Sequence, residues 1–171
     1  DKTGTLTKGE IGVVDVVTTS DLQPQDALAM TAAVEGDSEH PIARAIRHSA
    51  DEQQMARPAI TDFEALKGRG VKAVYDGQTI YVGGPRLLEY LDVERSPTLA
   101  QFAQESGADG QSVVYLVRKQ TVVASFALAD VIREESRSAV AALHEMNIEV
   151  AMLTGDSEDV ANAVAVALHI D

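Results

Sequence analysis

The sequence has no cysteine and no long apolar run, and each absence excludes a class of site or protein. Without cysteine, the chain can form neither a disulfide nor a zinc–thiolate site, and it has no cysteine nucleophile. The lack of disulfides is typical of cytosolic proteins. No stretch reaches the roughly eighteen apolar residues of a membrane-spanning helix, and the polar start does not resemble a signal peptide. We therefore expect these residues to be soluble.

Basic residues are scarce as well. The chain has 27 acidic and 14 basic residues, which gives it a formal net charge of −13. A charge of this sign makes a nucleic-acid backbone or an anionic membrane surface an unfavourable partner. ATP is also an anion, so a nucleotide site in this chain would depend on local hydrogen-bond donors, helix N-termini and Mg²⁺. With 45% hydrophobic residues, the chain can bury a core as one domain or as two small ones.

The first seven residues, DKTGTLT, have the composition of a phosphoryl-transfer loop. Asp1 offers a carboxylate nucleophile, while Lys2, Thr3 and Thr5 offer a cation and hydroxyl donors for the charge that develops on phosphate oxygens. A carboxylic acid two positions after the nucleophile could activate water and hydrolyse the acyl phosphate, but a threonine does this poorly. The loop therefore favours an aspartyl phosphate that persists.

Two segments in the middle of the chain have features of a nucleotide pocket. Ser38 is a candidate N-cap residue, and His40 stands beside a proline at a helix start, where its ring could stack on a purine. Taken alone, His40 is more typical of an ordinary helix N-terminus. Gly68 and Gly70 between strands, with Gly83 before a helix, would present bare backbone to a ligand. Such glycines on their own more often mark turns or bulges.

The periodicity of the apolar residues changes along the chain. Up to about residue 128 it predicts antiparallel strands and helices, which is an α+β pattern. Beyond Asp130 it predicts a helix over 132–146, an apolar strand over 148–153 and a helix over 157–169. This second pattern is of the α/β type and is typical of a parallel sheet covered by helices.

Three residues directly after the strand predicted at 148–153 could contribute to a phosphate site, because α/β sheets bind ligands at this edge. Thr154 could donate to a phosphate oxygen, and Gly155 allows a close backbone approach. Asp156 could cap the next helix or accept a hydrogen bond from a neighbouring donor. A plain strand-to-helix turn would account for the same residues.

These motifs together resemble the P-type ATPases, cation pumps whose catalytic domain has a haloacid dehalogenase-like fold. DKTGTLT is similar to their phosphorylation motif, LTGD at 153–156 to a second motif of that site, and SEHPIARAI at 38–46 to the nucleotide-domain signature of the heavy-metal branch. The resemblance implies a fold of the α/β and α+β classes. A haloacid dehalogenase-like phosphorylation domain would comprise residues 1–14 and 128–171, and a nucleotide-binding domain of antiparallel sheet and helices would be inserted at 15–127.

The resemblance also implies a role for each candidate residue. ATP would bind to Glu35, His40, Gly68, Gly70 and Gly83, with the adenine beside His40 and its amino edge near Glu35. The implied catalytic residues are Asp1, Lys2, Thr3, Asp130, Thr154, Gly155 and Asp156. Asp1 and Thr3 would also take part in binding Mg²⁺. Asp130 begins an Asp-x-x-Arg element ending at Arg133, and it either joins the phosphorylation site or locks the geometry between the domains.

The resemblance predicts the ATP-binding cytosolic region of a heavy-metal-exporting P-type ATPase. ATP and Mg²⁺ would be its cofactors, and the transmembrane and actuator domains of the same longer chain would be its partners, with the transported metal ion bound elsewhere in that chain. The residues around Gly83 look more like those of copper or silver exporters than of zinc or cadmium exporters. The expected location is the cytoplasmic face of a membrane.

Two features of the family are not found among these residues: an apolar strand before the phosphorylated aspartate, and a Gly-Asp-Gly-x-Asn-Asp magnesium motif. We therefore expect a fragment of a longer protein. Two other functions fit parts of the sequence. One is a regulatory nucleotide-binding module without catalysis. The other is a haloacid dehalogenase-like phosphatase with a cap domain, against which Thr3 and the SEHP motif both argue.

Overall fold

The computed structural model describes residues 1–19, 21–155 and 158–170. The strands are β1 (Thr7–Thr18), β2 (Thr61–Leu66), β3 (Gly70–Tyr75), β4 (Gln78–Gly83), β5 (Ser112–Arg118) and β6 (Thr121–Ile132). The helices are α1 (Pro24–Val34), α2 (Pro41–Glu52), α3 (Pro85–Leu91), α4 (Pro97–Ala108), α5 (Glu134–Glu145) and α6 (Glu158–Leu168), and Lys2–Leu6 (η1) forms one irregular helical turn. Among the described helices, none is both long enough and apolar enough to cross a membrane.

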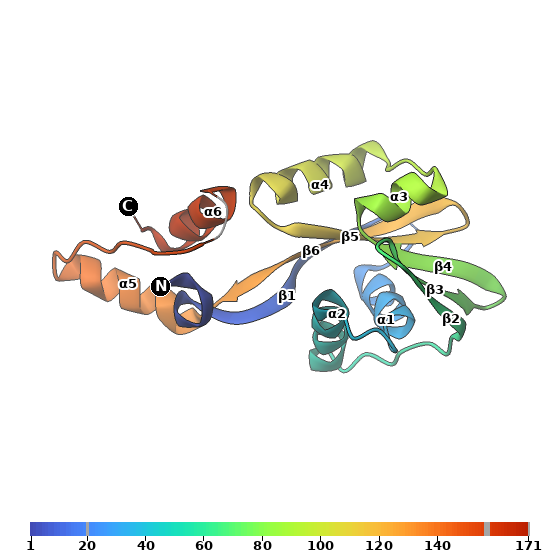
Figure 1. The fold of residues 1–171 in the computed structure, drawn as a ribbon. Coiled ribbons are helices and arrows are strands. Elements are labelled where there is room, and N and C mark those ends of the chain that lie inside the picture. The colour runs from blue at the N-terminus through green and yellow to red at the C-terminus, as the bar shows by residue number, and fades with distance from the viewer. Residues whose placement is uncertain (20, 156–157, 171) are drawn as a thin grey trace.

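All of these strands belong to one antiparallel sheet in the order β1-β6-β5-β4-β3-β2 (Figure 1). The β3–β4 hairpin turns at Asp76 and Gly77, whose φ angles of 49° and 70° suit the tight turn that this dipeptide predicts. Side chains alternate along β5. Leu116 packs into the core on one face of the sheet, and Tyr115 packs into the core on the other. The sheet is therefore buried on both faces along this strand.

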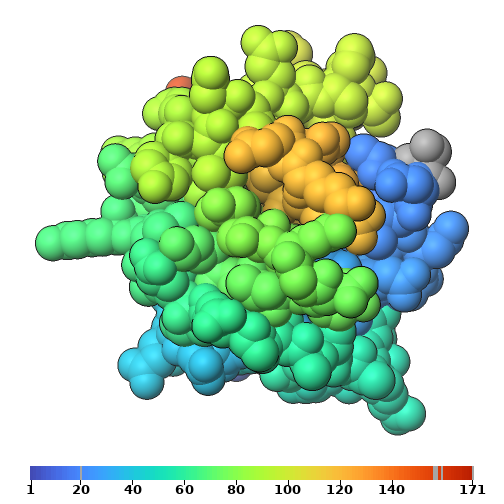
Figure 2. Space-filling view, turned by 90° about the vertical axis from the view of Figure 1, so that its right-hand side faces the viewer, coloured from blue at the N-terminus to red at the C-terminus, as the bar shows by residue number. Residues whose placement is uncertain are grey.

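Helices cover both faces of the sheet, with α1 and α2 on one side and α3 and α4 on the other (Figure 1). The first pair packs Leu28 and Ile46 into the core that contains Phe126 of β6. The second pair packs Leu87 and Leu99 against Tyr115 on the opposite face. At the far end of the sheet, the β5–β6 hairpin (orange) lies between these helices and the green strands (Figure 2). We call the sheet with α1–α4 the nucleotide body.

The two longest strands, β1 and β6, extend beyond the helices and join the nucleotide body to a smaller part of the molecule (Figure 1). This part contains η1, α5 and α6, and we call residues 1–6 and 133–170 the phosphoryl body. Its small core consists of Val140, Val164, Leu168 and Ile170. The domain boundaries predicted at residues 14/15 and 127/128 fall within β1 and β6, and these boundaries stay predictions.

The strand predicted over 148–153 is wrong for this structure, because these residues form neither a strand nor a helix. An apolar segment becomes a strand only when another strand bonds along its edge. Here the loop at the N-terminus supplies one such bond, from the Lys2 N–H to the Leu153 carbonyl, at 3.1 Å. The helices predicted on either side are present as α5 and α6.

Candidate functional site

Three segments distant in sequence meet at one cavity of the nucleotide body. They are the turn before α2, the loop between β2 and β3, and the end of β4. The cavity has a volume of about 420 Å³. Its lining includes all of the residues predicted to bind ATP, which are Glu35, His40, Gly68, Gly70 and Gly83. The fold therefore brings the predicted nucleotide residues together.

Glu35 gives this cavity a buried acceptor. The residue is only 6% exposed, and its Oε2 atom has no hydrogen-bond partner among the described residues. Burial raises the pKa of the Glu35 carboxyl, while a hydrogen bond from Ser38 and the charge of Arg47 act in the opposite direction. A buried oxygen without a partner is costly unless a ligand donates a hydrogen bond to it. The carboxyl is thus suited to an N–H donor of a bound molecule.

His40 is the N-cap residue of α2, so the prediction that Ser38 has this role is wrong. The Ile42 N–H donates to His40 Nδ1 at 3.3 Å, which satisfies one of the free amides at the helix start. Ser38 instead accepts from the His40 N–H at 3.5 Å through its Oγ. This hydrogen bond orients the exposed imidazole at the edge of the cavity through its Nδ1 atom.

Three glycines of the cavity, Gly68, Gly70 and Gly83, differ in the space that a side chain at each position would have. A Cβ at Gly70 would lie 2.1 Å from the Val82 carbonyl oxygen, and one at Gly83 would lie 2.2 Å from the Arg69 carbonyl oxygen. These two glycines therefore permit a close approach of β3 and β4. A Cβ at Gly68 would meet nothing within 4 Å, although its φ of +71° favours glycine. Of the three, Gly68 presents the open backbone that a ligand can approach.

Sequence reasoning missed the cations at this cavity. Lys67 and Arg69 line it, and together with Arg86 they also line an adjoining hollow of about 490 Å³. The Arg69 guanidinium lies 4.5 Å from the centroid of the Tyr90 ring. Within the described residues, none of the three cations forms an ion pair with a carboxylate. The available signal was the position of Lys67 and Arg69 on either side of Gly68 in an acidic chain.

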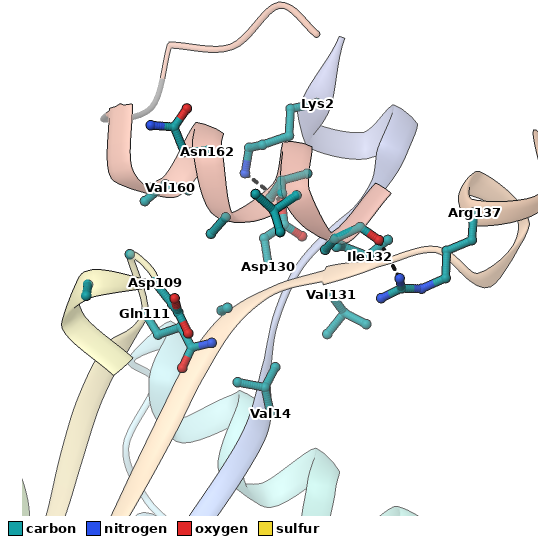
Figure 3. A pocket seen from close by; sticks show the side chains of 17 residues that line it. Lys2, Val14, Asp109, Gln111, Asp130, Val131, Ile132, Arg137, Val160 and Asn162 are labelled. Carbon is teal, nitrogen blue, oxygen red and sulfur yellow. Dashed lines mark hydrogen bonds and ion pairs between the residues drawn. The ribbon is translucent and has the colours of Figure 1, made fainter. Parts of the chain in front are cut away.

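The nucleophile candidate lies on the surface of the phosphoryl body. The Thr5 hydroxyl donates to Asp1 Oδ2 at 3.0 Å, and both Asp1 and Thr3 are exposed. Lys2 differs from this pair, since it is only 3% exposed. Its Nζ lies 3.5 Å from Asp130 Oδ2 (Figure 3). The lysine next to the candidate nucleophile therefore faces another carboxylate inside the molecule.

Asp130 and the start of α5 hold the N-terminal loop in place. Besides Lys2, Asp130 accepts hydrogen bonds from the Thr7 hydroxyl at 2.6 Å and the Gly9 N–H at 3.0 Å. Arg133 donates to the carbonyls of Thr7 at 3.0 Å and Gly4 at 3.3 Å. Asp130 thus joins the loop to β6, and Arg133 is more than a surface charge. Sequence reasoning gave no such role to Thr7, and no local pattern marks it.

The second half of the predicted phosphoryl site follows the segment at 148–153. The bond between the Lys2 N–H and the Leu153 carbonyl brings the residue before Thr154 beside the N-terminal loop. Thr154 is half-buried and Gly155 is exposed. Asp156 lies outside the described residues. The catalytic roles of these residues stay predictions.

Binding of Mg²⁺ by Asp1 and Thr3 also stays a prediction. In the described part of the chain, no group of three or more histidine, cysteine, aspartate and glutamate side chains gathers as a metal site. One exposed carboxylate beside hydroxyl groups matches the hard oxygen ligands that Mg²⁺ accepts. Because Mg²⁺ is commonly bound through one or two carboxylates together with substrate phosphates, this donor set fits a metal that arrives with a nucleotide.

A larger cavity of about 740 Å³ lies where the two bodies face each other (Figure 3). Lys2 and Asp130 line one side of it, and Asp109 and Val160 line another. Gly110 approaches α6 so closely that a Cβ there would lie 2.5 Å from a methyl carbon of Val160. The cavity is therefore bounded by the N-terminal loop and by a direct contact between α6 and the loop after α4.

Comparisons with known proteins agree with these features. The family model described as haloacid dehalogenase-like hydrolase matches residues 1–171. Copper-transporting ATPase 1 of Rhizobium meliloti (strain 1021) is 37% identical over 171 residues, which are 100% of this chain and 21% of that protein. The chain thus spans about a fifth of the length of the curated relatives it matches.

Two solved structures are similar as well. A zinc-transporting PIB-type ATPase in its E2.Pi state has a TM-score of 0.86 at 30% identity, over 100% of this chain and 27% of that chain. The N-domain of HMA8, a copper-transporting P-type ATPase, has a TM-score of 0.57 at 28% identity, over 69% of this chain and 99% of that one. The resemblance to heavy-metal P-type ATPases and the fold class expected from the motifs are confirmed.

Proposed function

The chain belongs to the haloacid dehalogenase-like hydrolase family, and we propose that it is the ATP-binding region of a heavy-metal-transporting P-type ATPase, in which ATP phosphorylates Asp1. The observation that carries this proposal is the cavity of the nucleotide body. Residues from three segments, selected as nucleotide ligands from the sequence, line one cavity. It contains a buried carboxyl oxygen of Glu35 that has no hydrogen-bond partner among the described residues. A cavity of this kind is suited to a base with an exocyclic amino group.

In the proposed complex, the adenine lies between Glu35 and His40. Glu35 accepts a hydrogen bond from the amino group of the base, and the imidazole of His40 packs against the ring. The triphosphate passes the open backbone of Gly68, where Lys67 and Arg69 balance part of its charge. These two cations compensate locally for an overall charge that repels the nucleotide.

Phosphoryl transfer would proceed from bound ATP to the Asp1 carboxylate. A bond forms between an Asp1 oxygen and the γ-phosphorus, the bond from that phosphorus to the bridging oxygen breaks, and ADP leaves. Thr5 orients the carboxylate through its 3.0 Å hydrogen bond, and Thr3 supplies a nearby hydroxyl donor. Bound Mg²⁺ would neutralise charge on the phosphate oxygens. Lys2 and Asp130 hold the loop in position, since each is engaged with the other.

The remaining parts of the proposal concern the whole protein. The transmembrane and actuator domains of a longer chain would use the phosphorylated Asp1 to move a metal ion, with this region at the cytoplasmic face of the membrane. We propose copper as that ion, because curated relatives that are 37% identical over the whole of this chain are named copper-exporting or copper-transporting ATPases. Measuring which metal stimulates ATP hydrolysis by the full-length protein tests this choice.

Titration with a non-hydrolysable ATP analogue tests the nucleotide site. In an NMR experiment on this chain, the amide signals of Glu35, His40, Gly68 and Gly83 should shift together, because one ligand contacts all three segments. The affinity should be weak, since the net charge of −13 repels the anionic nucleotide. Shifts restricted to the phosphoryl body would contradict the proposed site.

Labelling with γ-phosphate tests the role of Asp1. We expect the full-length protein to incorporate acid-stable, hydroxylamine-sensitive phosphate and the Asp1→Asn variant to lose it, because an amide cannot act as the nucleophile. The 171-residue chain should label little, since Asp1 is exposed and held by a single hydrogen bond from Thr5. A phosphate ester release assay distinguishes the phosphatase alternative, which requires turnover by this chain alone.

A further inference from the structure

Arg47 organises the wall of the nucleotide cavity without lining it. The residue lies two turns into α2 and is half-buried. Its Nη1 donates to the Ser38 carbonyl at 2.7 Å and, at shorter range, to the Glu35 carbonyl. The Ser38 N–H donates to the same Glu35 carbonyl at 3.1 Å. One guanidinium nitrogen therefore holds both ends of the turn from which the Glu35 side chain enters the cavity.

The same arginine also acts on the Glu35 carboxyl through its charge. Burial raises the pKa of Glu35, and Ser38 and Arg47 oppose that rise. The other charged or titratable groups lining the cavity with Glu35 are His40 on the same turn and Lys67 and Arg69 on the β2–β3 loop. Gly83 and Val114, which line the cavity from β4 and β5, carry no charge. Among these cations, Arg47 is thus the one that hydrogen bonds hold against the turn that carries Glu35.

The protonation state of Glu35 decides which base edge it can bind. An ionised carboxyl only accepts hydrogen bonds, whereas a protonated one can also donate. The 6-amino group of adenine donates to an ionised carboxyl. The 6-oxo group of guanine is an acceptor, so beside an ionised carboxyl it would leave two acceptors facing each other.

We propose that Arg47 is a positioning residue that sets the base selectivity of this cavity, because it orients Glu35 and keeps its carboxyl an acceptor that prefers adenine over guanine nucleotides. This inference rests on the proposed function. The pH dependence follows from the direction of the pKa shift. The ionised form of Glu35 is present above its raised pKa and is lost as the pH falls through that pKa. The preference for ATP over GTP should therefore decrease as the pH falls.

The experiment compares ATP and GTP affinities of the 171-residue chain by calorimetry across a pH series. The variants are Arg47→Gln, which keeps a donor but removes the charge, and Arg47→Lys, which keeps the charge. Arg44→Gln is the matched control, because Arg44 is exposed on the same helix and its side chain makes no hydrogen bond or ion pair within the described residues. Thermal unfolding of each variant checks that the fold is retained.

We expect Arg47→Gln to reduce the ATP:GTP affinity ratio at neutral pH about tenfold. It should also move the pH at which selectivity is half lost upward, because the pKa of Glu35 rises further without the arginine charge. Arg47→Lys should keep that pH near the wild-type value, and Arg44→Gln should change neither quantity. A merely structural role for Arg47 would not separate the Gln and Lys variants in this way.

Several outcomes would overturn the inference. A folded Arg47→Gln variant with the wild-type ratio and pH dependence would refute it and leave the proposed function standing. If that variant does not fold, the wild-type protein decides. Its ATP:GTP affinity ratio must decrease as the pH is lowered, and the midpoint of this decrease must match the pH at which ¹³C NMR shows the Glu35 carboxyl to titrate. An affinity ratio independent of pH refutes the inference. No binding of ATP by the wild-type chain would refute the proposed function itself.

Discussion

The interactions that stabilise the nucleotide body differ from those that stabilise the phosphoryl body. In the nucleotide body, apolar side chains such as Phe126 and Ile80 are fully buried between the sheet and its helices. In the described part of the phosphoryl body, four side chains form the core, while Leu153 and Val166 are 78% and 75% exposed. Instead, hydrogen bonds donated to the Asp130 carboxylate and hydrogen bonds donated by Arg133 fix its N-terminal loop.

This difference teaches where each body is sensitive to substitution. A core of many apolar contacts is disturbed most where there is no space, because interiors are close-packed. A loop fixed by a few polar groups is disturbed most when one of those groups is removed, because the partners then lose their hydrogen bonds. The two bodies should therefore respond to different kinds of change, and the following predictions test this from the largest effect to the smallest.

The largest effect is expected for Gly70→Ala in the nucleotide body. Its new methyl group would lie 2.1 Å from a backbone oxygen, and φ is +139° at this position. We expect a loss of about 4 kcal/mol in the free energy of unfolding, measured by urea denaturation. Gly68→Ala is the control, with a φ of +71° but open space around it, and it should cost about 1 kcal/mol. Equal losses in the two variants would contradict the distinction between these glycines.

A smaller and more local effect is expected for Asp130→Ala near the end of β6, where this residue anchors the N-terminal loop of the phosphoryl body. The change removes the acceptor of the Thr7 hydroxyl and the Gly9 N–H and the carboxylate beside the buried Lys2. We expect the loop to lose about 2–3 kcal/mol of stability, seen as faster hydrogen exchange at residues 1–9. ATP affinity should not change, because Asp130 does not line the nucleotide cavity.

The control for this change is Asp15→Ala on the strand paired with β6. Asp15 is exposed, and its carboxylate accepts a hydrogen bond from the adjacent Val16 N–H at 2.8 Å. Its removal should leave exchange in the N-terminal loop as in the wild type. If Asp15→Ala loosened the loop as much as Asp130→Ala, the anchoring role of Asp130 would be refuted.

The smallest effect on stability is expected for His40→Gln. The change removes one capping hydrogen bond, to the Ile42 N–H, and no core volume. The free energy of unfolding should fall by less than about 1 kcal/mol, while ATP affinity measured by calorimetry should fall several-fold. His48→Gln is the control on the same helix, since His48 is exposed and pairs only with Glu52 in the described residues. An unchanged ATP affinity in His40→Gln would leave His40 as a helix cap alone.

The sequence by itself determined the local elements of this protein and the chemistry of its motifs. Asp76-Gly77 predicted the β3–β4 hairpin, because few dipeptides accept two positive φ angles in succession. Pro41 and Pro85 are the first residues of α2 and α3, because proline suits the first turn of a helix. DKTGTLT and SEHP predicted the family that the comparisons then confirmed. All of these signals lie within a few residues of what they predict.

Only the tertiary structure decided which of these elements meet. Pairing of β1 with β6 places Lys2 beside Asp130, which lies 128 positions away in the sequence. Packing of α2 beside the turn at Glu35 brings Arg47 to that turn, and pairing of β3 with β4 explains Gly70 and Gly83. The apolar segment at 148–153 formed no strand, because an edge partner is a property of the fold. Local patterns fix the conformation of a segment, whereas its partners depend on contacts between segments far apart in the chain.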